Sequence, residues 1–168
     1  MLSKVVTRPA TPEDVPLISA LHDRVFGPGR FARTAYRVRE QKGPETEISA
    51  FCRLAMDGDQ LVAAIRMSEI SIGGNKGAAL LGPLVVASEY AGQGFGRTLI
   101  REALETARTG DIKIVVLVGD EPYYGRFGFK RVAPGTITFP GPVNPARILA
   151  IELEDGALQR FTGLVSGR

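Results

Sequence analysis

The order of apolar and polar residues predicts a chain built from alternating strands and helices. Apolar residues three and four positions apart predict helices over residues 12–25 and 96–109, and arginines on one face suit a further helix over 30–41. Short apolar or alternating runs predict strands, at 5–9, 49–56, 60–71, 80–87, 112–118, from 128 onward, and 147–152. The run 112–118 is almost continuously apolar, which is typical of a strand with parallel neighbours.

These elements predict one α/β (α+β) domain over residues 1–168, with its core over about 3–154. We expect a mixed, twisted sheet of six to seven strands flanked by about four helices. The chain has 168 residues and 44% hydrophobic content, enough for one substantial core. Residues 134–145 contain four prolines and are expected to form a rigid loop, while the tail after about 160 is expected to fray.

Residues that begin, end or interrupt elements refine this prediction. Thr11-Pro12 predicts a helix start, and the helix is expected to bury an apolar stripe that ends at Val25. Asp57-Gly58-Asp59 predicts a hairpin, and residues 73–77 predict a turn before the strand 80–87. Gly82-Pro83 lies inside that strand. Because proline has no N–H and cannot complete a central ladder, the sheet should bulge or open there.

A glycine-rich loop joins the strand 80–87 to the helix 96–109. Its glycines alternate with other residues, at Gly92, Gly94 and Gly96. Backbone amides in such a loop can face a ligand, and a helix N-terminus adds unpaired N–H groups and partial positive charge. Arg97 and Thr98 add a cation and a hydroxyl in the first turn. A pyrophosphate-bearing ligand is expected, although glycines also close turns for purely structural reasons.

Two common phosphate motifs fit this loop poorly. A P-loop has four residues between its glycines and then Lys-Ser/Thr, whereas Arg97-Thr98 follows closely spaced glycines. The dinucleotide fingerprint Gly-x-Gly-x-x-Gly would place its last glycine one residue after Gly96, and it also expects an acidic residue after the following strand. Here the following strand runs on to Val118-Gly119-Asp120, so no acidic residue closes it at the expected place.

Two motifs resemble the GCN5-related N-acetyltransferases (GNAT family). Residues 84–97 are similar to the coenzyme A-binding motif of that family, whose core reads Gln/Arg-x-x-Gly-x-Gly/Ala. Residues 123–129, Tyr-Tyr-Gly-Arg-Phe-Gly-Phe, are similar to the family's tyrosine-containing segment, and one helix and one strand separate the two motifs as in the family. The resemblance extends from the first strand to about residue 154. It departs at Ala91, where the family usually has Gln or Arg, and at Ser88, where proline is common.

The resemblance implies the acyl-CoA N-acyltransferase fold and acetyl-CoA as co-substrate. In that fold the fourth and fifth strands splay apart, and exposed backbone groups bind the pantetheine arm. The family pattern implies that the Val86 N–H polarises the thioester carbonyl. Tyr124, five residues before Phe129, takes the position of the tyrosine that protonates the departing sulfur. The implied cofactor-binding residues are Leu84, Val85, Val86, Ala91, Gly92, Gln93, Gly94, Phe95, Gly96, Arg97, Thr98, Tyr123, Tyr124 and Arg126.

The group that deprotonates the acceptor amine is left open by the sequence. Glu69, Asp120 and Glu121 are carboxylates near predicted strand ends that could act directly or through water. Carboxylates at such places are more often surface or capping residues. Arg126 either reaches the cofactor phosphates or pairs with Glu121.

Several other residues with charged or reactive side chains can be explained by purely structural roles. Arg30, Arg33 and Arg37 either form a solvated basic face or, as their place in the resembled family implies, recognise an acidic acceptor. His22 is the only histidine and lies close to an apolar stripe, where it is expected to pack. Cys52 is the only cysteine, and its apolar surroundings predict a buried strand thiol.

Composition narrows the class of protein. The net charge of +3, from 21 basic and 18 acidic residues, is too small to indicate a nucleic-acid partner, although it favours an anionic cofactor. One cysteine excludes an internal disulfide and a cysteine-rich metal site, and no metal is expected. No apolar run approaches the ~18 residues of a membrane span, and the first residues lack the features of a signal peptide. We therefore expect no membrane partner and a cytoplasmic protein.

The sequence thus predicts an acetyl-CoA-dependent N-acetyltransferase. Since no Cys–His or Ser–His pair suggests a covalent intermediate, a primary amine is expected to attack directly in a ternary complex. The acceptor is a small-molecule or peptide amine, and the family resemblance allows a homodimer. One alternative is a non-catalytic coenzyme A-binding sensor or regulatory module with the same fold. A further alternative is a nucleotide-binding protein that uses the glycine loop differently.

Overall fold

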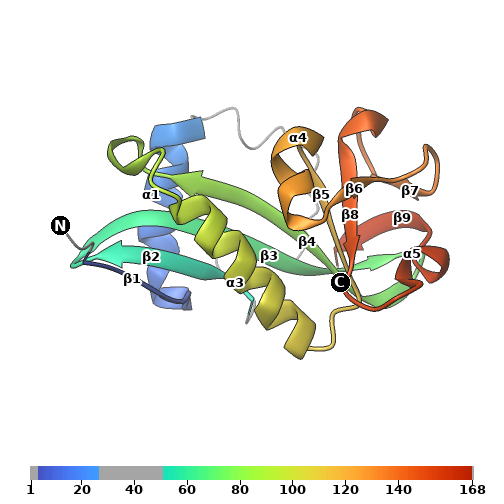
Figure 1. Cartoon of the computed structure of the whole chain (residues 1–168), viewed down its shortest axis with the longest axis horizontal. Helices are drawn as coiled ribbons and strands as arrows, with labels where there is room; N and C mark the ends of the chain where they lie inside the picture. Colours follow the sequence, from blue (N-terminus) through green and yellow to red (C-terminus); the bar gives the residue numbers. More distant parts are fainter. Residues whose placement is uncertain (1–3, 27–50, 168) are drawn as a thin grey trace.

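The computed structural model describes residues 4–26 and 51–167, which form one sheet and the helices packed on it (Figure 1). The predicted helix over 30–41, with Arg30, Arg33 and Arg37, lies outside the described residues. The described strands and α-helices are β1 (Val5–Pro9), α1 (Val15–Phe26), β2 (Arg53–Asp57), β3 (Gln60–Ile72), β4 (Asn75–Val86), α3 (Phe95–Thr109), β5 (Ile114–Val118), α4 (Glu121–Tyr124), β6 (Lys130–Arg131), β7 (Ile137–Thr138), β8 (Ile148–Glu152), α5 (Ala157–Arg160) and β9 (Gly163–Gly167).

The sheet is mixed, as expected from the sequence. Its strands follow the order β1-β2-β3-β4-β5-β8-β6, and β9 pairs with both β3 and β7. All pairs are antiparallel except β4 with β5 and β7 with β9. The predicted fold class is confirmed. Among the described residues the sheet has nine strands rather than six to seven, because β7 and β9 form in segments expected to be a loop and a frayed tail.

The central parallel pair separates halfway along β4. Residues 78–80 of β4 pair with residues 114–116 of β5, and beyond these residues the two strands no longer pair with each other. We call residues 84–86 of β4 and 117–118 of β5 the splayed end. Across from Ile65 and Met67, β4 carries one extra residue at Gly82–Pro83, which are joined by a cis peptide bond. The opening predicted from Gly82-Pro83 is therefore confirmed, and Figure 1 shows the two strands diverging.

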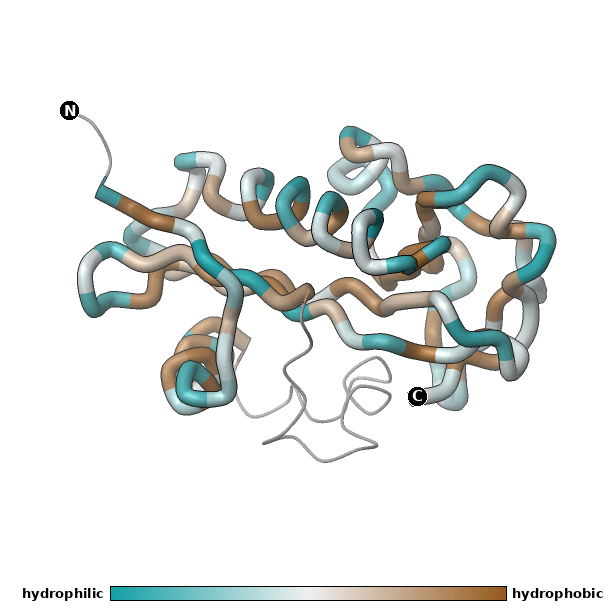
Figure 2. Tube along the Cα trace, turned by 90° about the horizontal axis from the view of Figure 1, so that it is seen from below, coloured by the Kyte–Doolittle hydropathy of each residue, from teal (hydrophilic) through white to brown (hydrophobic). Residues whose placement is uncertain are grey.

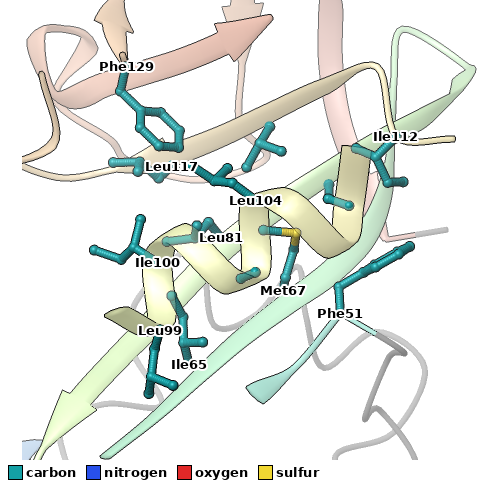
Figure 3. Close-up of a cluster of buried hydrophobic side chains, with 14 of the residues drawn as sticks. Phe51, Ile65, Met67, Leu81, Leu99, Ile100, Leu104, Ile112, Leu117 and Phe129 are labelled. Carbon is teal, nitrogen blue, oxygen red and sulfur yellow. The ribbon is translucent and has the colours of Figure 1, made fainter. Parts of the chain in front are cut away.

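Helix α3 covers one face of the sheet because its apolar residues form a single stripe. Leu99, Ile100 and Leu104 pack in one buried cluster with Ile65 and Met67 of β3 (Figure 3). The opposite face carries α1, so the two helices lie on either side of the sheet when it is viewed edge-on (Figure 2). None of the described helices is long and apolar enough to cross a membrane.

The start of α1 is fixed to β1 by a charged network. A short 3-10 helix, Pro12–Asp14, precedes α1. Arg8 donates two hydrogen bonds of 2.8 Å to the Asp14 carboxylate, which also accepts from the Thr11 N–H at 2.8 Å. The hydrogen bond from Arg8 is the main reason why the pKa of Asp14 falls from 3.8 to about 2.

Three local predictions were wrong. Val25 is 45% exposed rather than buried, because the face of α1 that meets the sheet is narrower than its apolar stripe. The turn after β3 contains only Gly73 and Gly74, so β4 begins at Asn75. The tail does not fray: β9 pairs with β3, and Val165 is fully buried, so the core extends beyond residue 154.

Gly73 explains how the C-terminal segment closes on the sheet. Its N–H donates to the Leu164 carbonyl at 2.9 Å, and its φ is +57°. A Cβ at this position would overlap the Thr162 carbonyl oxygen. Only glycine permits this approach, so the tight turn between β3 and β4 is also the docking point of β9.

Candidate active site

The glycine loop forms an anion-binding arrangement at the start of α3. Gly92 and Gly94 have φ of +79° and +87°, and Gly94 is the N-cap of α3. Within the described part of the chain, no acceptor is found for the N–H groups of residues 92–97. These donors, together with the helix dipole, favour a phosphate or pyrophosphate group.

Arg97 and Thr98, which were expected to assist the glycine loop, make different contacts with it. The Arg97 guanidinium folds back over Gly94, 3.2 Å from the position that a Cβ there would occupy. It therefore adds positive charge directly above the loop. Thr98 donates its N–H and its hydroxyl to the Gly94 carbonyl, both at 3.1 Å. Its hydroxyl proton is therefore already used inside the helix.

Further residues of the loop region lie at its surface or brace it. Ala91 and Gln93 are exposed, and Ala91 follows a 3-10 turn, Ser88–Tyr90. The ring of Phe95 packs edge-on against Tyr90 with centroids 6.1 Å apart. Tyr90 in turn donates a 2.8 Å hydrogen bond to Asp57, which anchors the loop to the hairpin between β2 and β3.

The splayed end of β4 leaves backbone donors pointing away from β3. Leu84, Val85 and Val86 pair with β3, and the Ala87 N–H donates to the Val62 carbonyl at 2.8 Å. Backbone groups alternate in direction along a strand. The N–H groups of Val86 and Leu84 therefore point toward the side from which β5 has separated.

Gly96 brings this edge of β4 together with α3 and α4. A Cβ on Gly96 would lie 3.3 Å from Leu84 Cδ2, 3.6 Å from Val86 Cγ2 and 3.5 Å from the Tyr123 hydroxyl. Glycine thus lets the first turn of α3 sit close to the strand edge. The Tyr123 hydroxyl therefore lies beside the first turn of α3.

Tyr124 lies against the end of β5. A Cβ on Gly119 would meet its ring at 2.7 Å, and the ring packs edge-on against Phe129 with centroids 6.0 Å apart. Burial raises the pKa of Tyr124 above its ordinary value of 10.0; Tyr123 and Asp120 raise it further, and Arg147 lowers it. The phenol therefore keeps its proton at neutral pH.

Two arginines stack on the aromatic side chains beside the loop. Arg126 lies over the Tyr123 ring at 5.5 Å, and Arg101 lies over the Phe127 ring at 5.7 Å. Of the two roles that the sequence left open for Arg126, the pair with Glu121 is not the one found, because Glu121 pairs with Arg131 at 3.6 Å. Arg101 was not among the predicted site residues, although it stands one helical turn after Arg97.

The three candidate bases occupy different places. Asp120 precedes α4 and pairs with Arg147 at 3.5 Å. Glu121, besides pairing with Arg131, accepts a 3.4 Å hydrogen bond from its N–H. Glu69 is half-buried on β3, opposite Ala79. Asp120 and Glu121 are thus close to Tyr124 in the sequence, whereas Glu69 lies on a different strand.

Arg147 was missed because it is far from Tyr124 in sequence. It immediately precedes β8, and its carbonyl accepts the Gly119 N–H at 2.9 Å, which holds it at the end of β5. No local sequence pattern identifies Arg147 as a site residue.

His22 and Cys52 are buried as expected, although Cys52 lies just before β2 rather than within it. Within residues 4–26 and 51–167, no group of three or more His, Cys, Asp and Glu side chains could hold a metal ion.

Comparison with known proteins finds acetyltransferases both among domain families and among individual relatives. The acetyltransferase (GNAT) domain family matches residues 6–132. The uncharacterized N-acetyltransferase YhbS of Escherichia coli K12 is 29% identical over 166 residues, which cover 96% of this chain and 95% of YhbS. YjhQ of the same strain, also an uncharacterized N-acetyltransferase, is 31% identical over 128 residues, which cover 74% of this chain and 68% of YjhQ.

Solved structures agree with these relatives. The crystal structure of E. coli YhbS in complex with CoA has a TM-score of 0.83 and 28% identity, covering 100% of this chain and 92% of that one. A GNAT family acetyltransferase from Brucella melitensis in complex with acetyl-CoA has a TM-score of 0.60 and 28% identity, covering 88% and 96%. Since the domain family matches well over half of the sequence, the chain belongs to the GNAT acetyltransferase family.

Proposed function

We propose that this protein is an N-acetyltransferase that transfers an acetyl group from acetyl-CoA to a primary amine in a ternary complex. The observation that carries the proposal is the pairing of an unsatisfied glycine loop at the start of α3 with an unpaired edge on β4. The first suits a pyrophosphate and the second suits an amide-bearing arm. The complexes of YhbS with CoA and of the Brucella relative with acetyl-CoA support this choice of ligand.

The cofactor site follows from these two features. The N–H groups of residues 92–97 and the Arg97 guanidinium bind the pyrophosphate. The splayed edge at Leu84, Val85 and Val86 binds the pantetheine arm through the backbone groups of Leu84 and Val86, which face away from β3. Tyr123 and Arg126, stacked on each other, form the wall opposite Gly96 and the end of β4.

Bound acetyl-CoA supplies an activated acetyl group and a thiolate leaving group. In the proposed mechanism the Val86 N–H, or the Leu84 N–H that points the same way, donates to the carbonyl oxygen as negative charge develops there. Tyr124 donates its phenolic proton to the departing sulfur as the new C–N bond replaces the C–S bond. The acceptor amine passes a proton to water or to one of Glu69, Asp120 and Glu121.

The first test is calorimetric titration with acetyl-CoA beside CoA, ATP and NAD. We expect micromolar binding of acetyl-CoA, and binding of ATP and NAD at least tenfold weaker. Amine-stimulated release of free thiol then separates an enzyme from a coenzyme A-binding sensor. Absence of binding to both CoA forms would overturn the proposal, and binding without turnover by any amine would favour the sensor.

A matched pair of glycine variants connects binding to the loop. Gly92 and Gly58 both have positive φ, of +79° and +59°, and a Cβ at either would meet no atom within 4 Å. Each change to alanine therefore costs similar strain, about 1–2 kcal/mol. We expect Gly92→Ala to weaken acetyl-CoA binding and Gly58→Ala, in the hairpin between β2 and β3, to leave it unchanged. The homodimer and the cytoplasmic location remain predictions.

A further inference from the structure

Three arginines beside the glycine loop have no carboxylate partner among the described residues. Arg97 folds over Gly94 at the start of α3, Arg101 lies one helical turn further along that helix, and Arg126 lies in the 3-10 turn after α4. All three residues are exposed. Six arginines elsewhere in the described chain do pair with a carboxylate: Arg8, Arg53, Arg108, Arg131, Arg147 and Arg160.

The carboxylates that are close to these arginines in the sequence pair with other cations. Glu102, next to Arg101, pairs with Arg53 at 2.7 Å. Glu121 pairs with Arg131 at 3.6 Å. The first turn of α3 contains no acidic residue. The described part of the chain therefore supplies no anion to balance the positive charge beside the glycine loop.

The placement of Arg97 and Arg101 on α3 is unfavourable for the helix alone. The two residues are four positions apart, where side chains of like charge are neighbours and repel each other. Arg97 also stands in the first turn, where the helix dipole disfavours a cation. A bound anion would remove both penalties. The arrangement thus favours a ligand whose negative charge extends along the helix beyond the loop itself.

Two half-buried rings hold the guanidinium groups of Arg101 and Arg126 in place. Arg101 lies over the Phe127 ring at 5.7 Å, and Arg126 lies over the Tyr123 ring at 5.5 Å. The two rings pack edge-on against each other with centroids 5.9 Å apart. Stacking uses the face of a guanidinium and leaves the N–H donors at its edge free. Two preorganised sets of donors therefore lie near the Tyr123 hydroxyl, which approaches Gly96.

We propose that Arg101 and Arg126 bind the 3′-phosphate of coenzyme A, so that the protein distinguishes coenzyme A from the form that lacks this phosphate. The inference rests on the proposed acetyl-CoA site. There the loop amides and Arg97 bind the pyrophosphate, which leaves two arginines for the one remaining phosphate of the cofactor. A phosphate monoester carries a charge of about −1.5 to −2 at neutral pH, which two guanidinium groups balance. Arg101 is about 6 Å further along the helix than Arg97, a distance that one ribose can bridge.

The first test compares two ligands that differ by this single phosphate. Calorimetric titration of the wild-type protein measures the dissociation constants of CoA and dephospho-CoA. We expect dephospho-CoA to bind about 10- to 100-fold more weakly, because it loses charge-assisted hydrogen bonds. Equal affinities would overturn the inference and leave the proposed function intact. Absence of binding by either ligand and by acetyl-CoA would instead overturn the proposed function.

Substitutions assign the preference to the two arginines. Arg101→Gln and Arg126→Gln should each weaken CoA binding about three- to tenfold and change dephospho-CoA binding by less than about twofold. Arg101→Lys should keep part of the preference, because it retains the charge but not the planar set of donors. Arg108→Gln is the matched control. Arg108 is an exposed arginine of the same helix that already pairs with Glu105, so its loss should change neither affinity.

A preference that both glutamine variants keep, or an equal weakening of both ligands, would overturn the inference, since the 3′-phosphate would then be bound elsewhere. Both arginines are exposed, so the variants should fold, and their Tm checks this. A second probe avoids the pantetheine arm. Adenosine 3′,5′-bisphosphate should displace acetyl-CoA from the wild-type protein at lower concentration than adenosine 5′-monophosphate does, and this advantage should shrink in Arg101→Gln. Equal displacement by the two nucleotides in the wild-type protein would contradict the inference.

Discussion

The two halves of β4 share one strand but have opposite surroundings. In the first half, residues 78–80 pair with β3 on one side and β5 on the other, and all three are fully buried. In the second half, Leu84, Val85 and Val86 pair only with β3, and Leu84 and Val86 are half-buried. The change from pairing on both sides to pairing with β3 alone takes place around Gly82–Pro83.

The comparison shows how one strand can serve both stability and binding. In the first half of β4, residues 78–80, the backbone groups are paired with β3 and β5, so this half contributes only to the core. The splayed half keeps donors available, and Gly96 lets the N-terminus of α3 approach the same edge. Stability and ligand binding should therefore respond to substitutions at different positions along β4.

The largest expected effect is a difference between two leucines of this strand. Leu80 is fully buried, so Leu80→Ala should lower the free energy of unfolding by about 2–5 kcal/mol. Leu84 is only half-buried, so Leu84→Ala should cost about half as much while weakening acetyl-CoA binding. Urea unfolding and calorimetry measure the two quantities. Equal losses of stability would show that the two halves of β4 do not differ in this way.

At the splayed end, turnover should depend on one of two adjacent tyrosines. Tyr124→Phe should lower kcat by about 10- to 1000-fold, because the general acid is lost while the ring packing on Phe129 is kept. Tyr123→Phe is the matched control. Its hydroxyl lies near Gly96, so the change should affect acetyl-CoA affinity more than kcat. The reverse result would move the acid to Tyr123.

The pH profile gives a second readout for Tyr124. Burial raises its pKa above 10.0, and a general acid acts in its protonated form. The wild-type kcat should therefore not fall between pH 7 and pH 9 through loss of this proton. A decrease of kcat in that range that is absent from Tyr124→Phe would contradict the raised pKa.

The Arg8–Asp14 pair supports the splayed half from the opposite face, because α1 packs on Val85 and Ala87. The pKa of Asp14 is lowered from 3.8 to about 2, so its stabilising contribution is complete above pH 3.8 and is lost as the pH falls through 2. This shift corresponds to about 2 kcal/mol. Asp14→Asn should be less stable than wild type by about that amount at pH 6, with a difference that shrinks toward pH 2. Acetyl-CoA affinity of the folded variant at pH 7 should be unchanged.

Sequence alone predicted the splayed half better than the closed end of the sheet. The glycine loop, the opening at Gly82–Pro83 and the helix 96–109 each depend on neighbouring residues, and all three were found where expected. In contrast, β9 exists because Gly167 pairs with Ile70, almost a hundred residues away. Arg147 reaches Tyr124 only through the pairing of β8 with β5. Such contacts leave no local pattern in the chain.

The smallest expected effect concerns the approach of α3 to β4. Gly96→Ala would place a Cβ 3.3 Å from Leu84 Cδ2 and 3.5 Å from the Tyr123 hydroxyl, so the helix N-terminus must shift slightly from the strand edge. Alanine gains about 1 kcal/mol in helix propensity, which offsets the crowding, so stability should change little. Acetyl-CoA affinity should fall by about three- to tenfold, roughly 0.7–1.4 kcal/mol.

Gly125→Ala is the matched control for that substitution. Gly125 lies directly after Tyr124, has a φ of −57° and would place its Cβ in open space. It should therefore leave acetyl-CoA affinity unchanged although it is close to the same tyrosines. If both variants bind acetyl-CoA as tightly as wild type, the close approach at Gly96 serves packing alone. The difference between the halves of β4 would then rest on backbone pairing without help from α3.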